Sequence, residues 1–181
     1  MNIFSLGLYD IISEWGEQKV ESLISSFKCS LDPDAESFLK KSSIKHEKKG
    51  ISRTYIVFEK DDFENLHIIG YYTLAVKCFA VYDEHTMPEN LIAMMNVNRN
   101  IAQAYLLGQL AKADETEKGF GKIMMNAALD AFKGGYDTFG CRTVRLDCKS
   151  VPSLIQYYES QGFISIGKNH DNTLNQMVMI M

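Results

Sequence analysis

The chain has 181 residues, 46% of them hydrophobic and 23% charged, which predicts one globular domain covering residues 1–181. No apolar run reaches the roughly 20 residues of a membrane span, and the start of the chain lacks the pattern of a signal peptide, so we expect a cytoplasmic protein with no membrane partner. The net charge of −4 argues mildly against a dedicated nucleic-acid binder.

Apolar residues recur at helical spacing over residues 10–28. A second helix is predicted to begin behind a cap at Asp32 or Asp34 and to end at Gly50. This helix includes the densest basic run of the chain, residues 40–49, for which a solvated helix face is the favoured interpretation.

Residues 53–58 and 67–76 are rich in β-branched and aromatic side chains, and they predict two strands of an antiparallel hairpin. Residues 84–100 are predicted to be a connection, in which a short helical stretch near 91–95 is expected. Residues 104–111 are almost entirely apolar, which predicts a strand that is buried on both faces.

A longer helix is predicted from Gly119 to Phe132 on the spacing of its apolar residues, with Ile123 on the buried face, and Gly134-Gly135 is expected to stop it.

The remaining elements alternate. Residues 143–148 predict a strand, and Pro152 predicts the first turn of a helix that is capped by Ser150 and ends at Gly162. Two further strands are expected over residues 163–166 and 176–180. The whole order predicts a mixed α/β sheet with helices on its faces.

The four cysteines and four histidines show no zinc-site spacing, so we expect no metal. The cysteines are expected to be small buried residues. They are Cys29, Cys78, Cys141 and Cys148.

The junction between residues 104–111 and the following helix predicts a diphosphate cradle. Gly119-Phe120-Gly121 opens this helix, where backbone N–H groups are unpaired and the helix dipole adds positive charge. Glycine lets a diphosphate approach the backbone closely, and Lys118 and Lys122 would add point charges. The same Gly-x-Gly pattern is also found in ordinary tight turns.

Two motifs in this order resemble the GNAT acetyltransferases. Residues 116–121, Thr-Glu-Lys-Gly-Phe-Gly, are similar to the family's phosphate loop, Gln/Arg-x-x-Gly-x-Gly/Ala, except that Thr116 replaces Gln or Arg. Residues 158–163, Tyr-Glu-Ser-Gln-Gly-Phe, are similar to the family's Tyr-x-x-x-Gly-Phe. The resemblance covers roughly residues 27–181 and is strongest to a branch that includes toxins of toxin–antitoxin pairs, which acetylate aminoacyl-tRNA.

The resemblance implies the GNAT fold, an α/β fold with a single mixed central sheet and helices on both faces. It also implies acetyl-CoA as cosubstrate, a primary amine as acceptor and no metal. The family's tyrosine, which protonates the leaving thiolate, corresponds to Tyr158, for which a role as a core-edge aromatic is the alternative. The implied cofactor-binding residues are Leu110, Ala111, Lys112, Glu117, Lys118, Gly119, Phe120, Gly121 and Lys122.

Three functions compete. The first is an N-acetyltransferase acting on a small-molecule or protein amine, with Glu117, Asp147 and Asp114 as candidate bases among which the sequence does not choose. The second is a toxin that acetylates aminoacyl-tRNA and is held by an antitoxin. The negative net charge disfavours this toxin function, whereas the resemblance to the toxin branch favours it. An aminoacyl-tRNA acceptor would need no general base. The third is a non-catalytic module that binds acyl-CoA. Whether the chain forms a homodimer is left open.

Overall fold

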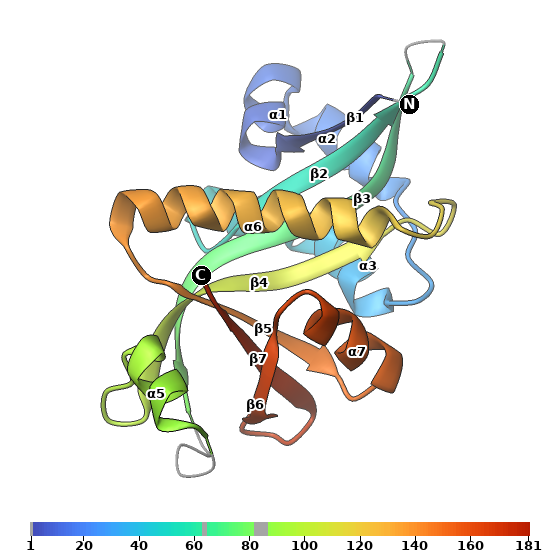
Figure 1. Cartoon of the computed structure of the whole chain (residues 1–181). Helices are drawn as coiled ribbons and strands as arrows, with labels where there is room; N and C mark the ends of the chain where they lie inside the picture. The colour runs from blue at the N-terminus through green and yellow to red at the C-terminus, as the bar shows by residue number, and fades with distance from the viewer. Residues whose placement is uncertain (1, 63–64, 82–86) are drawn as a thin grey trace. The chain divides into compact units, whose positions relative to one another are not determined.

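The computed structural model describes residues 2–62, 65–81 and 87–181. The strands form one hydrogen-bonded sheet in the order β1-β2-β3-β4-β5-β7-β6 (Figure 1). The chain divides into two compact units, and β3, β4 and α6 contribute residues to both. The first unit is Met1–Ala75 with Gln109–Leu129, and the second is Val76–Gly108 with Asp130–Met181.

The first unit holds the N-terminal helices and an antiparallel meander. β1 pairs antiparallel with β2, and β2 pairs antiparallel with β3, as predicted for the hairpin. β1 was not expected from the sequence. The elements are β1 (Asn2–Gly7), α1 (Leu8–Trp15), α2 (Glu17–Ser25), α3 (Pro33–Lys41), α4 (Ser43–Lys49), β2 (Arg53–Lys60), the start of β3 (Leu66–Ala80), the end of β4 (Ile101–Lys112) and the first half of α6 (Phe120–Phe139).

Both predicted N-terminal helices are interrupted. Gly16 separates α1 from α2 with a φ of 83°, a backbone conformation that glycine adopts without a Cβ clash. Ser42 separates α3 from α4. Asp32 is the cap of α3, since its carboxylate accepts the Ala35 N–H at 3.4 Å. Gly50 ends α4 in the left-handed region, as predicted.

Neighbouring residues of β3 show that helices cover both faces of the sheet in this unit. Tyr71 is buried, stacks on Phe38 and donates its hydroxyl to the Ala35 carbonyl of α3 at 2.6 Å. Gly70 points the opposite way, where a Cβ would collide with Met124 of α6. The predicted α/β sheet with helices on both faces is therefore confirmed.

The second unit completes the sheet. β4 pairs parallel with β5, whereas β7 pairs antiparallel with both β5 and β6, so the sheet is mixed, as predicted. Its elements are the rest of β3 and β4, α5 (Glu89–Met95), the end of α6, β5 (Thr143–Lys149), α7 (Pro152–Ser160), β6 (Ile164–Lys168) and β7 (Leu174–Ile180).

The end of α6 corrects the sequence prediction. The helix runs through Gly134 and Gly135 to Phe139. A helix tolerates interior glycine at a cost of about 1 kcal/mol each, and Gly135 packs directly against the ring of Tyr105. The buried face is also rotated from the predicted one. Ile123 is 46% exposed, whereas Phe120, Met124, Met125, Ala128 and Phe132 are buried.

Two further expectations were wrong. Ser150 does not cap α7, because its hydroxyl accepts a hydrogen bond from Asn175 at 3.3 Å, and the cap position is Val151. β4 is not buried on both faces. Leu106, Gly108 and Leu110 are all more exposed than the core residues beside them.

The cysteines follow the expectation only in part. Cys29 and Cys148 are buried, Cys78 is exposed and Cys141 is partly exposed. The described residues contain no cluster of side chains suited to a metal ion. None of the described helices has the length and apolar character that crossing a membrane requires.

Candidate cofactor site

The loop between β4 and α6 is anchored on β3 at its entrance. The Ala113 N–H and the Thr116 hydroxyl both donate to the Ile69 carbonyl, at 2.9 and 2.7 Å. Lys112 donates its ammonium to the Thr116 carbonyl at 2.5 Å. Thr116 is 9% exposed, so the residue that replaces Gln or Arg in the motif serves here to fix the loop.

After Thr116 the backbone donors are unused. No described residue accepts a hydrogen bond from the N–H groups of residues 117–121, and the next backbone bond runs from Lys122 N–H to the Gly119 carbonyl at 3.1 Å. Gly119 has a φ of +103°, and the space where a Cβ would point is open. These N–H groups lie at the start of a 20-residue helix, which adds the positive end of its dipole. The arrangement suits a bound diphosphate.

The predicted site residues of the loop are thus contiguous at one helix start. Glu117, Lys118 and Lys122 are exposed, whereas Phe120 is buried and anchors the first turn in the core. The loop glycine and the free donors fit the group that the sequence predicts, with Lys118 and Lys122 as the nearby cations.

The three predicted cofactor-binding residues of β4 differ in how far they are buried. Ala111 is buried in the core of the first unit, while Leu110 and Lys112 are partly exposed. The ladder with β5 consists of Tyr105–Val144 and Leu106–Arg145, so residues 110–112 have no β5 partner in it. Their backbone groups therefore form no bond of that ladder. The ammonium of Lys112, in contrast, is already engaged by Thr116.

A cavity of about 670 Å³ lies beside this loop in the first unit. The sequence did not predict it, because its walls come from four separate segments. Its carboxylates outnumber its basic groups, so phosphate is better placed at the backbone donors than in the cavity. The carboxylates are those of Glu59, Asp114, Glu115 and Glu117, and the basic groups are Lys28 and His67.

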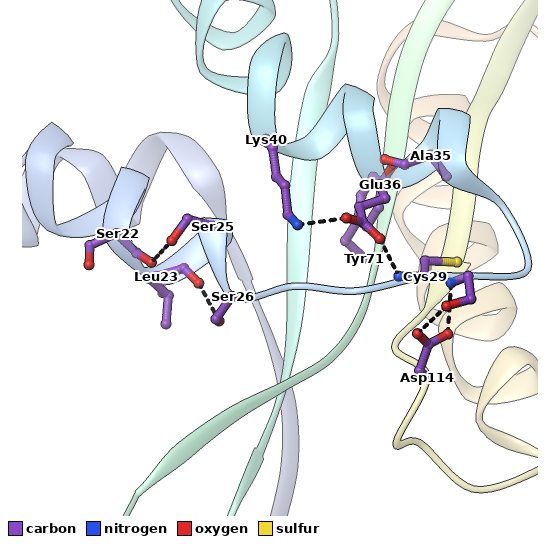
Figure 2. Close-up of polar contacts among 11 residues, drawn as sticks. Ser22, Leu23, Ser25, Ser26, Cys29, Ala35, Glu36, Lys40, Tyr71 and Asp114 are labelled. Atoms are coloured by element: carbon purple, nitrogen blue, oxygen red, sulfur yellow. Dashed lines mark hydrogen bonds and ion pairs between the residues drawn. The ribbon is translucent and has the colours of Figure 1, made fainter.

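Two of the three candidate bases are engaged in hydrogen bonds. Asp114 accepts from the backbone N–H and the hydroxyl of Ser30, at 2.8 and 2.7 Å (Figure 2). These bonds lower the pKa of Asp114, which makes it a weaker base. Asp147 accepts two bonds from Arg145, at 3.1 and 2.5 Å. Glu117 is exposed.

Tyr158 lies on α7 in the second unit and is 8% exposed. Its ring packs edge-on against Phe163, with centroids 6.0 Å apart. Its carbonyl accepts the Phe163 N–H at 3.1 Å, and Gly162 between them has a φ of 95°. The Tyr-x-x-x-Gly-Phe spacing therefore has a local structural cause, a glycine-dependent turn at the end of the helix.

Tyr157 precedes Tyr158 on α7 and is partly exposed. Its hydroxyl is buried and has no hydrogen-bond partner in the described part of the chain. Burial raises the pKa of Tyr157. Nothing in the local sequence predicts this unbonded hydroxyl.

These elements, in this order and strand arrangement, form the fold of the GNAT acetyltransferases. No protein-family model and no curated protein matches the sequence. The solved structure of AtaT complexed with acetyl-methionyl-tRNAfMet is similar to this chain with a TM-score of 0.70 and 18% identity, over 96% of this chain and 94% of that one.

Two other solved structures give the same result. A tyrosine-to-phenylalanine mutant of KacT matches with a TM-score of 0.73 and 19% identity, covering 99% of this chain and 95% of that one. A mutant AtaT toxin bound to the C-terminus of the antitoxin AtaR and acetyl-CoA matches with a TM-score of 0.70 and 17% identity, covering 99% and 94%. The predicted likeness to the toxin branch is thus confirmed for the fold.

Proposed function

We propose that this protein is an N-acetyltransferase that uses acetyl-CoA. The observation that carries the proposal is the row of unbonded N–H groups over residues 117–121, at the start of α6 and beside Gly119. Such a row binds the diphosphate of a cofactor without a metal. A structure of AtaT, which shares the fold, contains acetyl-CoA.

Acetyl transfer to an amine forms a carbon–nitrogen bond and breaks the carbon–sulfur bond of the thioester. Backbone groups of residues 110–112 would hold the arm of the cofactor and polarise the carbonyl. Tyr158 would donate its phenolic proton to the leaving sulfur, since a phenol with a pKa near 10 matches a thiolate in basicity. With Asp114 and Asp147 engaged, an amine that is already neutral is the most suitable acceptor.

The acceptor we propose is the α-amino group of an aminoacyl-tRNA. The net charge of −4 disfavours RNA as the acceptor. The similarity in fold to AtaT, which was solved in complex with acetyl-methionyl-tRNAfMet, favours it. A cognate antitoxin is the matching partner, because AtaT also has a structure with AtaR.

The distribution of lysines also supports an RNA acceptor. Lysines of α3 and α4 line a concavity of about 380 Å³. Lys48 pairs with Glu17, and Lys40 pairs with Glu36. The others have no ion pair in the described chain, and we name them the lysine surface: Lys41, Lys45 and Lys49. The same concavity contains one carboxylate without an ion pair among the described residues, that of Glu21, so its three unpaired cations still leave an excess of positive charge that would attract a phosphate backbone.

The cofactor half of the proposal is tested by thermal unfolding with acetyl-CoA. A ligand at 100 times its Kd adds about 2.7 kcal/mol, which raises the Tm of a chain of this size by about 5–10 °C. Gly121→Asp should abolish the shift and keep the fold, because aspartate suits the first turn of a helix but repels a diphosphate. Gly121→Ala is the matched neutral control. An unchanged Tm of the wild-type protein with saturating acetyl-CoA would refute the cofactor assignment.

The acceptor half is tested with labelled acetyl-CoA and a pool of charged tRNA. Mass spectrometry of the aminoacyl ends should find N-acetylated amino acids, and deacylated tRNA should take up no label. If label entered proteins or small amines and charged tRNA remained unmodified, the enzyme class would stand and the acceptor would be wrong.

A further inference from the structure

The segment between α2 and α3 is bonded directly to the entrance of the cofactor loop. Three hydrogen bonds connect Asp114 to residues 28–30. The Asp114 N–H donates to the Lys28 carbonyl at 2.9 Å, and the Asp114 carboxylate accepts the Ser30 N–H and hydroxyl at 2.8 and 2.7 Å. Figure 2 shows the carboxylate of Asp114 directed at this segment. The backbone of Asp114 donates and its side chain accepts, so both are held against residues 28–30.

The same segment is held separately from α3. The Cys29 N–H donates to the Glu36 carboxylate at 2.8 Å, and Glu36 pairs with Lys40 at 2.7 Å (Figure 2). Cys29 is 3% exposed, although Ser30 and Asp114 beside it are exposed. A buried thiol therefore lies under a set of solvent-exposed hydrogen bonds, which open more readily than buried ones.

On the loop side, Asp114 lies three residues before the free donors begin at residue 117. The other anchors of the loop entrance, from Ala113 and Thr116, hold it on β3. Between Thr116 and the first turn of α6 the described chain has no further backbone anchor. The direction of the N–H groups therefore depends on how the entrance is held.

We propose that Asp114 is a positioning residue that couples the cofactor loop to the segment between α2 and α3, so that cofactor binding closes this segment over Cys29. The inference rests on the proposed function, since it needs a cofactor at the loop. Coupling is reciprocal, so whatever holds the segment closed also tightens cofactor binding by the same factor.

The thiol of Cys29 is a built-in reporter of this coupling. Alkylation of each cysteine by iodoacetamide can be followed by peptide mass spectrometry on the whole chain, in the presence and absence of acetyl-CoA, which has no free thiol. We expect acetyl-CoA to slow alkylation of Cys29 about fivefold or more, within the usual range of coupling between sites. The exposed Cys78 is the internal control and should react at an unchanged rate.

The variants separate coupling from mere packing. Asp114→Ala should speed alkylation of Cys29, remove the protection by acetyl-CoA, and weaken acetyl-CoA binding by the factor by which protection fell. Ser30→Ala should do the same more weakly, and Ser30→Thr, which keeps the hydroxyl, should restore wild-type behaviour. Glu36→Ala is the matched control, because it removes the bond from α3 to the same segment. It should speed alkylation while acetyl-CoA still protects.

Two results would overturn the inference. One is wild-type acetyl-CoA affinity in a folded Asp114→Ala variant, and the other is Cys29 alkylation in the wild type that acetyl-CoA leaves unchanged although it raises the Tm. Either of these leaves the proposed function intact. Absence of any Tm shift in the wild type refutes the proposed function and this inference together.

Discussion

The two adjacent glycines of α6 should respond to alanine in opposite directions. Gly134 and Gly135 both lie inside the helix, so alanine gains about 0.5–1 kcal/mol at either position from helix propensity alone. At Gly134 a Cβ meets nothing within 4 Å. Gly134→Ala should therefore stabilise the protein by about that amount.

At Gly135 a Cβ would lie 2.9 Å from the hydroxyl oxygen of Tyr105, and 3.1 and 3.2 Å from two of its ring carbons. The tyrosine has little freedom to retreat, because its hydroxyl donates to the Gly140 carbonyl at 2.8 Å and its ring stacks on Phe132. Overpacking of this kind costs about 1–3 kcal/mol. After the propensity gain, Gly135→Ala should lose about 1 kcal/mol of stability, within a range of about 0–2.5 kcal/mol.

The assay is thermal and urea unfolding of both variants beside the wild type. Each kcal/mol shifts the Tm by about 2–4 °C in a chain of this size, so the two variants should lie on opposite sides of the wild type. Tyr105→Phe in the Gly135→Ala background should recover part of the loss, since it removes the closest atom. If Gly135→Ala were as stable as Gly134→Ala, the packing explanation for the continued helix would be wrong.

The remaining predictions concern function and pH. Tyr158→Phe should slow acetyl transfer about 10²-fold or more with little change in acetyl-CoA affinity. Tyr157→Phe is the neighbour control, and full activity in Tyr158→Phe would refute the role of Tyr158 as general acid. Replacing the lysine surface with glutamine should reduce the salt dependence of tRNA binding by a slope of about 2–3, and an unchanged slope would place the RNA elsewhere. The bonds from Ser30 lower the pKa of Asp114 below its ordinary value of 3.8. The ionised carboxylate therefore contributes its full stabilisation above pH 3.8, and this contribution is lost as the pH falls through the lowered pKa. The Tm difference between the wild type and Asp114→Ala should therefore be constant near neutral pH and shrink in acid.

Much of the fold could be predicted from local pattern. The alternation in residues 53–58, the helical spacing around Met124 and Ala128, and the caps at Asp32 and Gly50 all depend on near neighbours in the sequence. The start of α6 could be predicted for the same reason. A Gly-x-Gly after a strand predicts a helix start, and a helix start leaves its first backbone N–H groups unpaired.

The failures have a common physical cause, which is contact between residues far apart in the chain. The glycine at position 135 lies inside the helix because the ring of Tyr105 leaves no room for a side chain there. Ser150 does not cap α7, and its hydroxyl accepts a hydrogen bond from Asn175 instead. The hydrogen bonds of Asp114 are equally long-range, because its carboxylate accepts from Ser30, 84 residues away. Such pairings carry no local signature.

β1 has a consequence for how the chain tolerates change at its beginning. Its six residues pair with Tyr55–Lys60 and occupy one border of the sheet. If they were deleted, the outer row of amide and carbonyl groups on β2 would become accessible to any extended chain nearby. Ile56 and Phe58 would lie on that open border, and Phe58 would lose its ring contact with Phe4. Proteins that lack β1 would then be prone to associate edge to edge through β2, so this strand protects the chain from self-association.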